Sequence, residues 1–185
     1  MMKSCQVEWR KQGISTMLFG DHFLKPSQPS GNIPFDTAVT KQGYIVYTDP
    51  TPTEQTVNIV KNENIETLIK LKKWRPFNIC STSSGDLLVV MQISDDFQQS
   101  NIVGCYSGTT KKQTICILFY DRGHGFHSSD NTTKCFTENK NLDICVADSG
   151  SNEVLVVNQA GTLRFRYLPT PKNQPFYPAG ITTDS

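Results

Sequence analysis

The sequence lacks long apolar runs, long helix-forming stretches and any marked excess of one charge. No apolar stretch approaches the roughly 18 residues that a membrane-spanning helix needs, so we predict no membrane span. No long segment rich in Ala, Glu, Leu and Lys occurs, which disfavours an all-helical fold. Eighteen basic and seventeen acidic residues leave a net charge of +1, so the overall charge gives no argument for a polyanionic partner.

Cysteine and histidine patterns typical of zinc sites are also missing. The six cysteines contain no C-x-x-C pair, and with the three histidines they show no zinc-finger spacing. Most of them sit among apolar residues, which predicts small buried thiols in a reducing compartment; they are Cys5, Cys80, Cys105, Cys116, Cys135 and Cys145. Disulfides, and glycosylation at Asn131, would require a secreted chain.

The N-terminal sequence MMKSCQVEWRKQGISTML lacks the apolar core of a signal peptide. It carries charges at Glu8, Arg10 and Lys11 instead. The default expectation is therefore a cytoplasmic protein with no membrane partner.

The segment from 142 to 167, LDICVADSGSNEVLVVNQAGTLRFRY, shows the strand pattern most clearly. Apolar residues alternate at Leu142, Ile144 and Val146, which is the period of a strand with one buried face. After the turn-forming run DSGSN, the apolar, β-branched run VLVV suits a strand covered on both faces. A second turn, NQAG, leads into another alternating strand. The pattern predicts an antiparallel meander with neighbours on both faces.

The same order of strands and turns appears twice earlier, from about 35 to 71 and from about 77 to 119. Pro34-Phe35-Asp36 and Pro76-Phe77-Asn78 begin two copies that are 42 residues apart, and Pro178-Ala179-Gly180-Ile181 begins another 102 residues later. With one copy in that longer interval, the mean period is about 48 residues, which is typical of four-stranded propeller blades.

We therefore predict an all-β fold, a partial β-propeller of four-stranded antiparallel blades. The expected blades cover about 33–73, 74–120 and 133–170, with the start of another at 176–185. Residues 1–32 form an N-terminal segment that is expected to supply a strand of a preceding blade. Because a propeller needs about four to eight blades to close, we expect a fragment of a longer protein or closure by another chain.

Residues 33–185 resemble an array of NHL repeats. The resemblance rests on Pro178-Ala179-Gly180-Ile181, Val146-Ala147-Asp148, Asn152-Glu153-Val154-Leu155-Val156 and Gly161. It points to invertebrate tripartite-motif-like proteins, which carry RING and B-box zinc domains, a coiled coil and a six-bladed propeller. The start of the repeat is intact only in the last copy, and this sequence has no RING or B-box. The resemblance implies at most the substrate-recognition arm of a ubiquitin ligase.

Motifs for catalysis are scarce. No nucleophile-elbow motif marks an activated serine, and no Gly-rich phosphate loop lies between a strand and a helix. We expect a non-catalytic module that binds a protein client, with no catalytic residue, metal or cofactor.

A first alternative is single-stranded RNA binding through the segment IKLKKWRPF. Its basic side chains beside an aromatic ring could neutralise phosphates and stack on a base; they are Lys70, Lys72, Lys73, Trp74 and Arg75. The competing interpretation is structural: Trp74 packs between blades, and Lys72 and Lys73 are solvated loop charges.

A second alternative is a metal-dependent propeller enzyme. His124 and His127, with Asp121 and Asp130 nearby, form the one metal-like group of the sequence. The surrounding segment YDRGHGFHSSDNTT is polar and rich in Gly and Ser, and no further ligands are spaced to support a metal, so an ordinary surface loop between blades is the preferred interpretation.

Overall fold

The computed structural model describes residues 34–62, 64–93, 101–115, 134–168 and 176–183, together with three short N-terminal strands. These strands are β1 (Cys5–Glu8), β2 (Thr16–Phe19) and β3 (His22–Leu24). They pair with one another in an antiparallel sheet of order β1-β2-β3. The expected contribution of residues 1–32 to a neighbouring blade stays a prediction.

Three four-stranded antiparallel sheets follow along the chain. The first sheet contains β4 (Thr37–Val39), β5 (Ile45–Asp49), β6 (Thr56–Lys61) and β7 (Asn64–Lys70). The second contains β8 (Trp74–Ser81), β9 (Leu87–Ile93), β10 (Asn101–Ser107) and β11 (Thr110–Ile115). The third contains β12 (Lys134–Glu138), β13 (Ile144–Asp148), β14 (Glu153–Val157) and β15 (Leu163–Tyr167). Each sheet is a meander, because its strands lie side by side in chain order.

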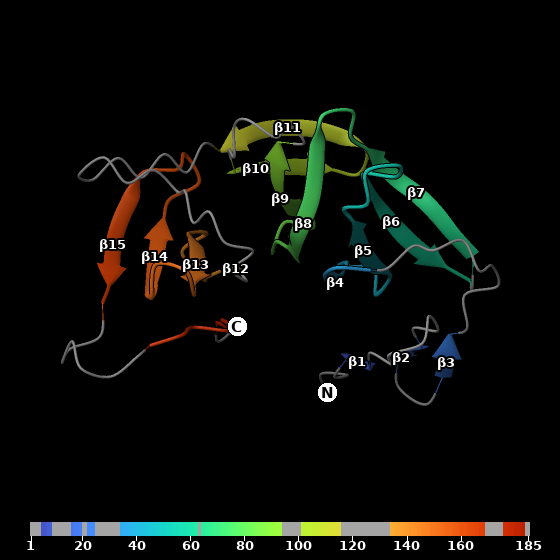
Figure 1. Cartoon of the computed structure of the whole chain (residues 1–185), viewed down its shortest axis with the longest axis horizontal. Coiled ribbons are helices and arrows are strands. Elements are labelled where there is room, and N and C mark those ends of the chain that lie inside the picture. Colours follow the sequence, from blue (N-terminus) through green and yellow to red (C-terminus); the bar gives the residue numbers. More distant parts are fainter. Residues whose placement is uncertain are drawn as a thin grey trace.

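The three sheets stand next to one another along an arc (Figure 1). The first strands of the sheets, β4, β8 and β12, lie on the inner side of the arc, and β8 contacts both β4 and β12. The last strands, β7, β11 and β15, lie on the outer side. This is the arrangement of consecutive propeller blades, so the predicted all-β, partial propeller fold is confirmed. In the described residues, no helix is long and apolar enough to cross a membrane.

The core of the molecule lies between the sheets rather than within any one of them. On β9, Val89 and Met91 pack against residues of the first sheet, and Leu88 and Val90 pack against residues of the third. Successive residues of a strand point to opposite faces, so a continuous apolar strand can contact two neighbouring sheets. Strands β5 and β13 are also buried along their whole length. Neighbours on both faces are thus shown for the second sheet; for the 142–167 segment, Leu155 and Val157 place the second sheet on one face.

Four tight turns share one hydrogen-bond pattern. In each, the first amide donates to the fifth carbonyl and the fourth amide donates to the first carbonyl; the turns are Thr40–Tyr44, Thr82–Asp86, Asn139–Asp143 and Asn158–Thr162. The fourth residue has a positive φ: 86° at Gly43, 88° at Gly85, 84° at Gly161 and 62° at Leu142. Leu142 was expected inside a strand, but it occupies the turn position that glycine fills in the other three.

Candidate functional site

The strands of the three sheets run between two ends of the molecule, and different connections lie at each end. We call the end at which β4, β8 and β12 begin the crossover end, because the connection 71–73 passes there from the first sheet to the second. The loop 50–55 between β5 and β6 lies at the same end. The four tight turns lie at the opposite end, which we call the far end.

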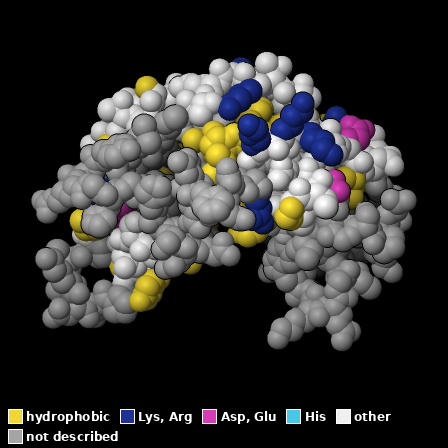
Figure 2. Space-filling model, turned by 45° about the horizontal axis from the view of Figure 1, so that its top comes forward, with side chains coloured by type: hydrophobic (Ala, Val, Ile, Leu, Met, Phe, Trp, Pro, Cys, Tyr) yellow, Lys and Arg dark blue, Asp and Glu magenta, His cyan; other side chains and the backbone are white. Residues whose placement is uncertain are grey.

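The predicted basic segment lies at the crossover end. Lys70 ends β7, and Lys72 and Lys73 lie in the connection; all three are exposed. Trp74 begins β8, is half-buried and packs against the core between the first and second sheets. Figure 2 shows Lys and Arg side chains gathered near the top of that view, over these two sheets. The segment therefore offers exposed ammonium groups, while its tryptophan ring is partly used in packing.

Arg75 contacts both the β5–β6 loop and the Phe77 ring at the crossover end. Its Nε donates to the carbonyl of Pro50 at 2.8 Å, so it holds the β5–β6 loop against β8. Its guanidinium also lies 5.4 Å from the ring centre of Phe77, within the range of a cation–π contact. The Phe77 ring in turn meets the Phe35 ring edge-to-face, with centres 5.0 Å apart at 88°. Phe35 is 47% exposed, so an ordered aromatic ring faces solvent at this end.

Asp36 makes a partly buried polar contact between the first and second sheets that the sequence did not predict. Its Oδ2 accepts from the Ile79 amide at 3.0 Å and from Asn78 Nδ2 at 3.3 Å, and its Oδ1 accepts from the Thr37 amide at 2.8 Å. Burial raises the pKa of this carboxyl above its usual value, although the three hydrogen bonds act in the opposite direction. The carboxylate thus joins the inner strands of two sheets. The 42-residue repeat of Asp36 and Asn78 was visible in the sequence, but their contact was not.

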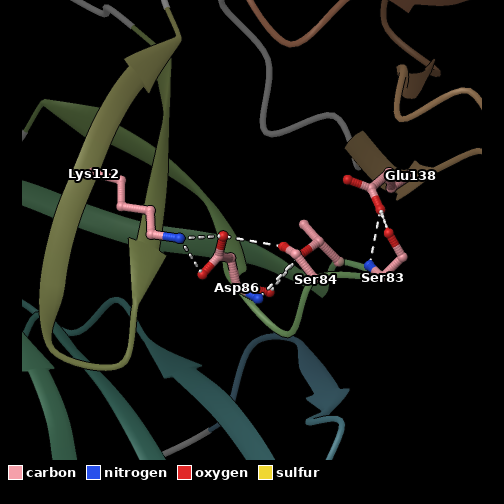
Figure 3. Close-up of polar contacts among 6 residues, drawn as sticks. Ser83, Ser84, Asp86, Lys112 and Glu138 are labelled. Carbon is pink, nitrogen blue, oxygen red and sulfur yellow. Dashed lines mark hydrogen bonds and ion pairs between the residues drawn. The ribbon is translucent and has the colours of Figure 1, made fainter.

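A second polar group joins the second and third sheets at the far end (Figure 3). Glu138 Oε2 accepts from the Ser83 amide at 2.8 Å and from Ser83 Oγ at 2.7 Å. In the same turn, Asp86 pairs with Lys112 at 2.8 Å and accepts from Ser84 Oγ at 3.1 Å. The hydrogen bond from Lys112 lowers the pKa of Asp86. These contacts are exposed and connect structural elements, so we do not assign them a binding role.

The described cysteines show no sign of an activated nucleophile. Cys80, Cys105, Cys135 and Cys145 are free thiols. Burial raises the pKa of each, to about 12 for Cys80, where the charge of Glu138 adds to the effect. A raised thiol pKa disfavours the reactive thiolate.

The metal hypothesis concerns residues outside the described part of the chain. Asp121, His124, His127 and Asp130 all lie there. Among the residues that the structure describes, no group of three or more His, Cys, Asp or Glu side chains could hold a metal ion.

Comparison with solved structures supports the fold. The chain is similar to virginiamycin B lyase from Staphylococcus aureus (TM-score 0.61, 14% identity), covering 93% of this chain and 53% of that one. It is similar to a protein of unknown function from Bacteroides caccae (0.60, 13%), covering 89% and 57%. It is also similar to a chain of the nidogen–laminin complex (0.59, 13%), covering 95% and 65%.

These comparisons show a β-propeller-like fold. No family model and no curated protein matches the chain. The chain spans between half and two thirds of the length of these three solved structures. At identities of 13–14%, the likeness shows the fold and leaves the activity open.

Proposed function

We propose that this chain is a non-catalytic, protein-binding part of a β-propeller and that its crossover end contacts the partner. The exposed Phe35 ring carries this proposal. It is held in place by Phe77, which lies beneath the guanidinium of Arg75. Aromatic and Arg side chains are enriched at the centres of protein interfaces. A ring that is already ordered in the free protein loses less conformational entropy on binding, which favours affinity.

In its finer form, the proposal is that the chain belongs to the substrate-recognition propeller of a tripartite-motif-type ubiquitin ligase. The support is the resemblance of residues 33–185 to NHL repeats. In this role, the chain recruits a client protein and a RING domain elsewhere supplies the ligase activity. The likeness to a chain of the nidogen–laminin complex is consistent with protein binding by this fold.

Site-specific photo-crosslinking tests the binding face. A photoreactive phenylalanine analogue replaces Phe35 in one variant and Ile65 in a matched control. The two residues are almost equally exposed, at 47% and 48%, but Ile65 is the second residue of β7, near the far end. We expect a protein adduct in cells from position 35 and not from position 65. Adducts of equal yield at both positions, or no protein adduct at position 35, would contradict the proposal.

The RNA alternative retains one favourable observation, which is the exposure of Lys70, Lys72 and Lys73. A base-stacking platform would also need access to the Trp74 ring, which packs against the core between two sheets. The test is salt-dependent binding of single-stranded RNA that is lost when Lys72, Lys73 and Arg75 are replaced by Ala. The absence of measurable RNA binding at low salt rules this alternative out.

A further inference from the structure

Resting on the proposed function, we infer that the crossover end binds an acidic segment of the partner protein. Four cations bind the acidic side chains of this segment, and we call them the basic track: Lys70, Lys72, Lys73 and Arg75. The Phe35 ring contacts an apolar side chain of the same segment. The partner is thus defined by its chemistry: carboxylates followed by an apolar side chain.

The basic track runs from the outermost strand of the first sheet to the innermost strand of the second. Lys70 ends β7, the outermost strand of the first sheet, and Arg75 lies on β8, the innermost strand of the second. Lys72 and Lys73 lie between them on the connection. Beyond Arg75 the same strand reaches Phe77, which contacts Phe35. The cations therefore run from the outer strand inward and end beside an exposed aromatic ring.

The lysines of the basic track differ in their pairing from Lys61 and Lys112, whereas Lys41 and Lys111 at the far end also have no ion pair with a described carboxylate. Lys61 pairs with Glu66 at 3.4 Å, and Lys112 pairs with Asp86 at 2.8 Å. Within the described ranges, Lys70, Lys72 and Lys73 have no ion pair with a carboxylate. A partner carboxylate can therefore approach them without first displacing a described acidic side chain.

A peptide fits this surface better than a nucleic acid does. Binding of single strands stacks successive bases on accessible aromatic rings. Trp74, the ring inside the basic track, packs against the core, which leaves Phe35 as the exposed ring beside the track.

Fluorescence anisotropy of the full chain tests the inference with defined probes. The probes are a labelled Glu-rich peptide with one Phe, the same peptide with Ala in place of Phe, and labelled oligouridylate. We expect the Phe-containing peptide to bind more tightly than the other two and to lose affinity as salt increases. Lys72→Glu with Lys73→Glu should weaken its binding by about tenfold or more, which corresponds to reversing two close charges.

The matched control reverses two lysines near the far end, Lys41→Glu and Lys111→Glu, so that the net charge changes equally. Both side chains are exposed. This control should change the affinity by less than about twofold, since its charges lie away from the bound peptide. Circular dichroism checks that both double variants fold, and Lys72→Gln with Lys73→Gln should give a smaller loss in the same direction.

Three results overturn the inference: no peptide binding, equal losses in the two double variants, or tighter binding of oligouridylate than of the peptide. The crosslinking experiment separates its failure from that of the proposed function. A client that crosslinks at position 35 regardless of Lys72→Glu and Lys73→Glu leaves protein binding intact and removes the acidic segment. The lack of any protein adduct at position 35 removes both.

Discussion

Asp36 and Asn78 occupy equivalent positions in consecutive sheets, 42 residues apart, and Asn78 Nδ2 donates to Asp36 Oδ2 at 3.3 Å. The amide of the next residue, Ile79, donates to the same oxygen at 3.0 Å. The repeat thus supplies an acceptor in one sheet and donors in the following one. Aligning the tight turns places Cys135 at the equivalent position of the third sheet, where its Sγ donates to the Ala179 carbonyl at 3.2 Å.

The raised pKa of Asp36 predicts a specific pH dependence of stability. Between the usual value of 3.8 and the raised native pKa, the folded state binds the proton more tightly than the unfolded state does. The contribution of Asp36 to the free energy of unfolding therefore increases as the pH falls through the native pKa towards 3.8. Urea unfolding across this range should show the native protein gaining stability relative to Asp36→Asn. A constant difference between the two proteins contradicts the assignment.

Leu155 should be a major contributor to packing between the second and third sheets. It is 1% exposed and packs with residues of both. Leu155→Ala should lower the free energy of unfolding by about 2–5 kcal/mol, the usual cost of a cavity in a packed core. Leu163→Ala on the outer strand, where Leu163 is 40% exposed, should cost less than about 1 kcal/mol. Equal costs in chemical denaturation would argue against packing of these sheets on one another.

Gly104 on β10 is required by a close approach of side chains. An added Cβ would lie 2.6 Å from Met91 Cε and 2.6 Å from the Tyr106 ring. Gly104→Ala should therefore destabilise the fold by about 1–3 kcal/mol, because the core must shift to make room. At Gly180, an added Cβ meets nothing within 4 Å, so Gly180→Ala should be nearly neutral. Thermal unfolding of the two variants distinguishes these outcomes.

Leu142 is a position where a substitution should stabilise the protein. It adopts φ 62° in a turn whose equivalents carry glycine, and this conformation costs a residue with a Cβ roughly 1–2 kcal/mol. Leu142→Gly should recover about 1 kcal/mol, although the added flexibility of the unfolded chain offsets part of the gain. The reverse change, Gly43→Ala, should destabilise its turn. A lower unfolding midpoint for Leu142→Gly would show that the side chain has a packing role.

Strand patterns and the 42-residue spacing were sufficient to predict the sheets, because buried strands and glycine turns leave strong local signals. Strand β12 was not predicted. Its sequence KCFTE contains only two apolar residues, Cys135 and Phe136, and both are half-buried. Leu142 was misplaced because an apolar turn residue extended the alternation of the next strand by one step. The role of Asp36 depends on contacts between sheets, and a single sequence contains no local signal for such contacts.

Amide hydrogen exchange of the protein, measured with and without the Glu-rich, Phe-containing peptide, tests most directly which end of the strands binds the partner. The account predicts slower exchange of backbone amides in 70–77 and in 35–36 when the peptide is bound, with no change in the far-end turns 40–44 and 139–143. At the same peptide concentration, the lysine double variant, Lys72→Glu with Lys73→Glu, should show much weaker protection. Protection of the far-end turns without protection of 70–77 would contradict the account.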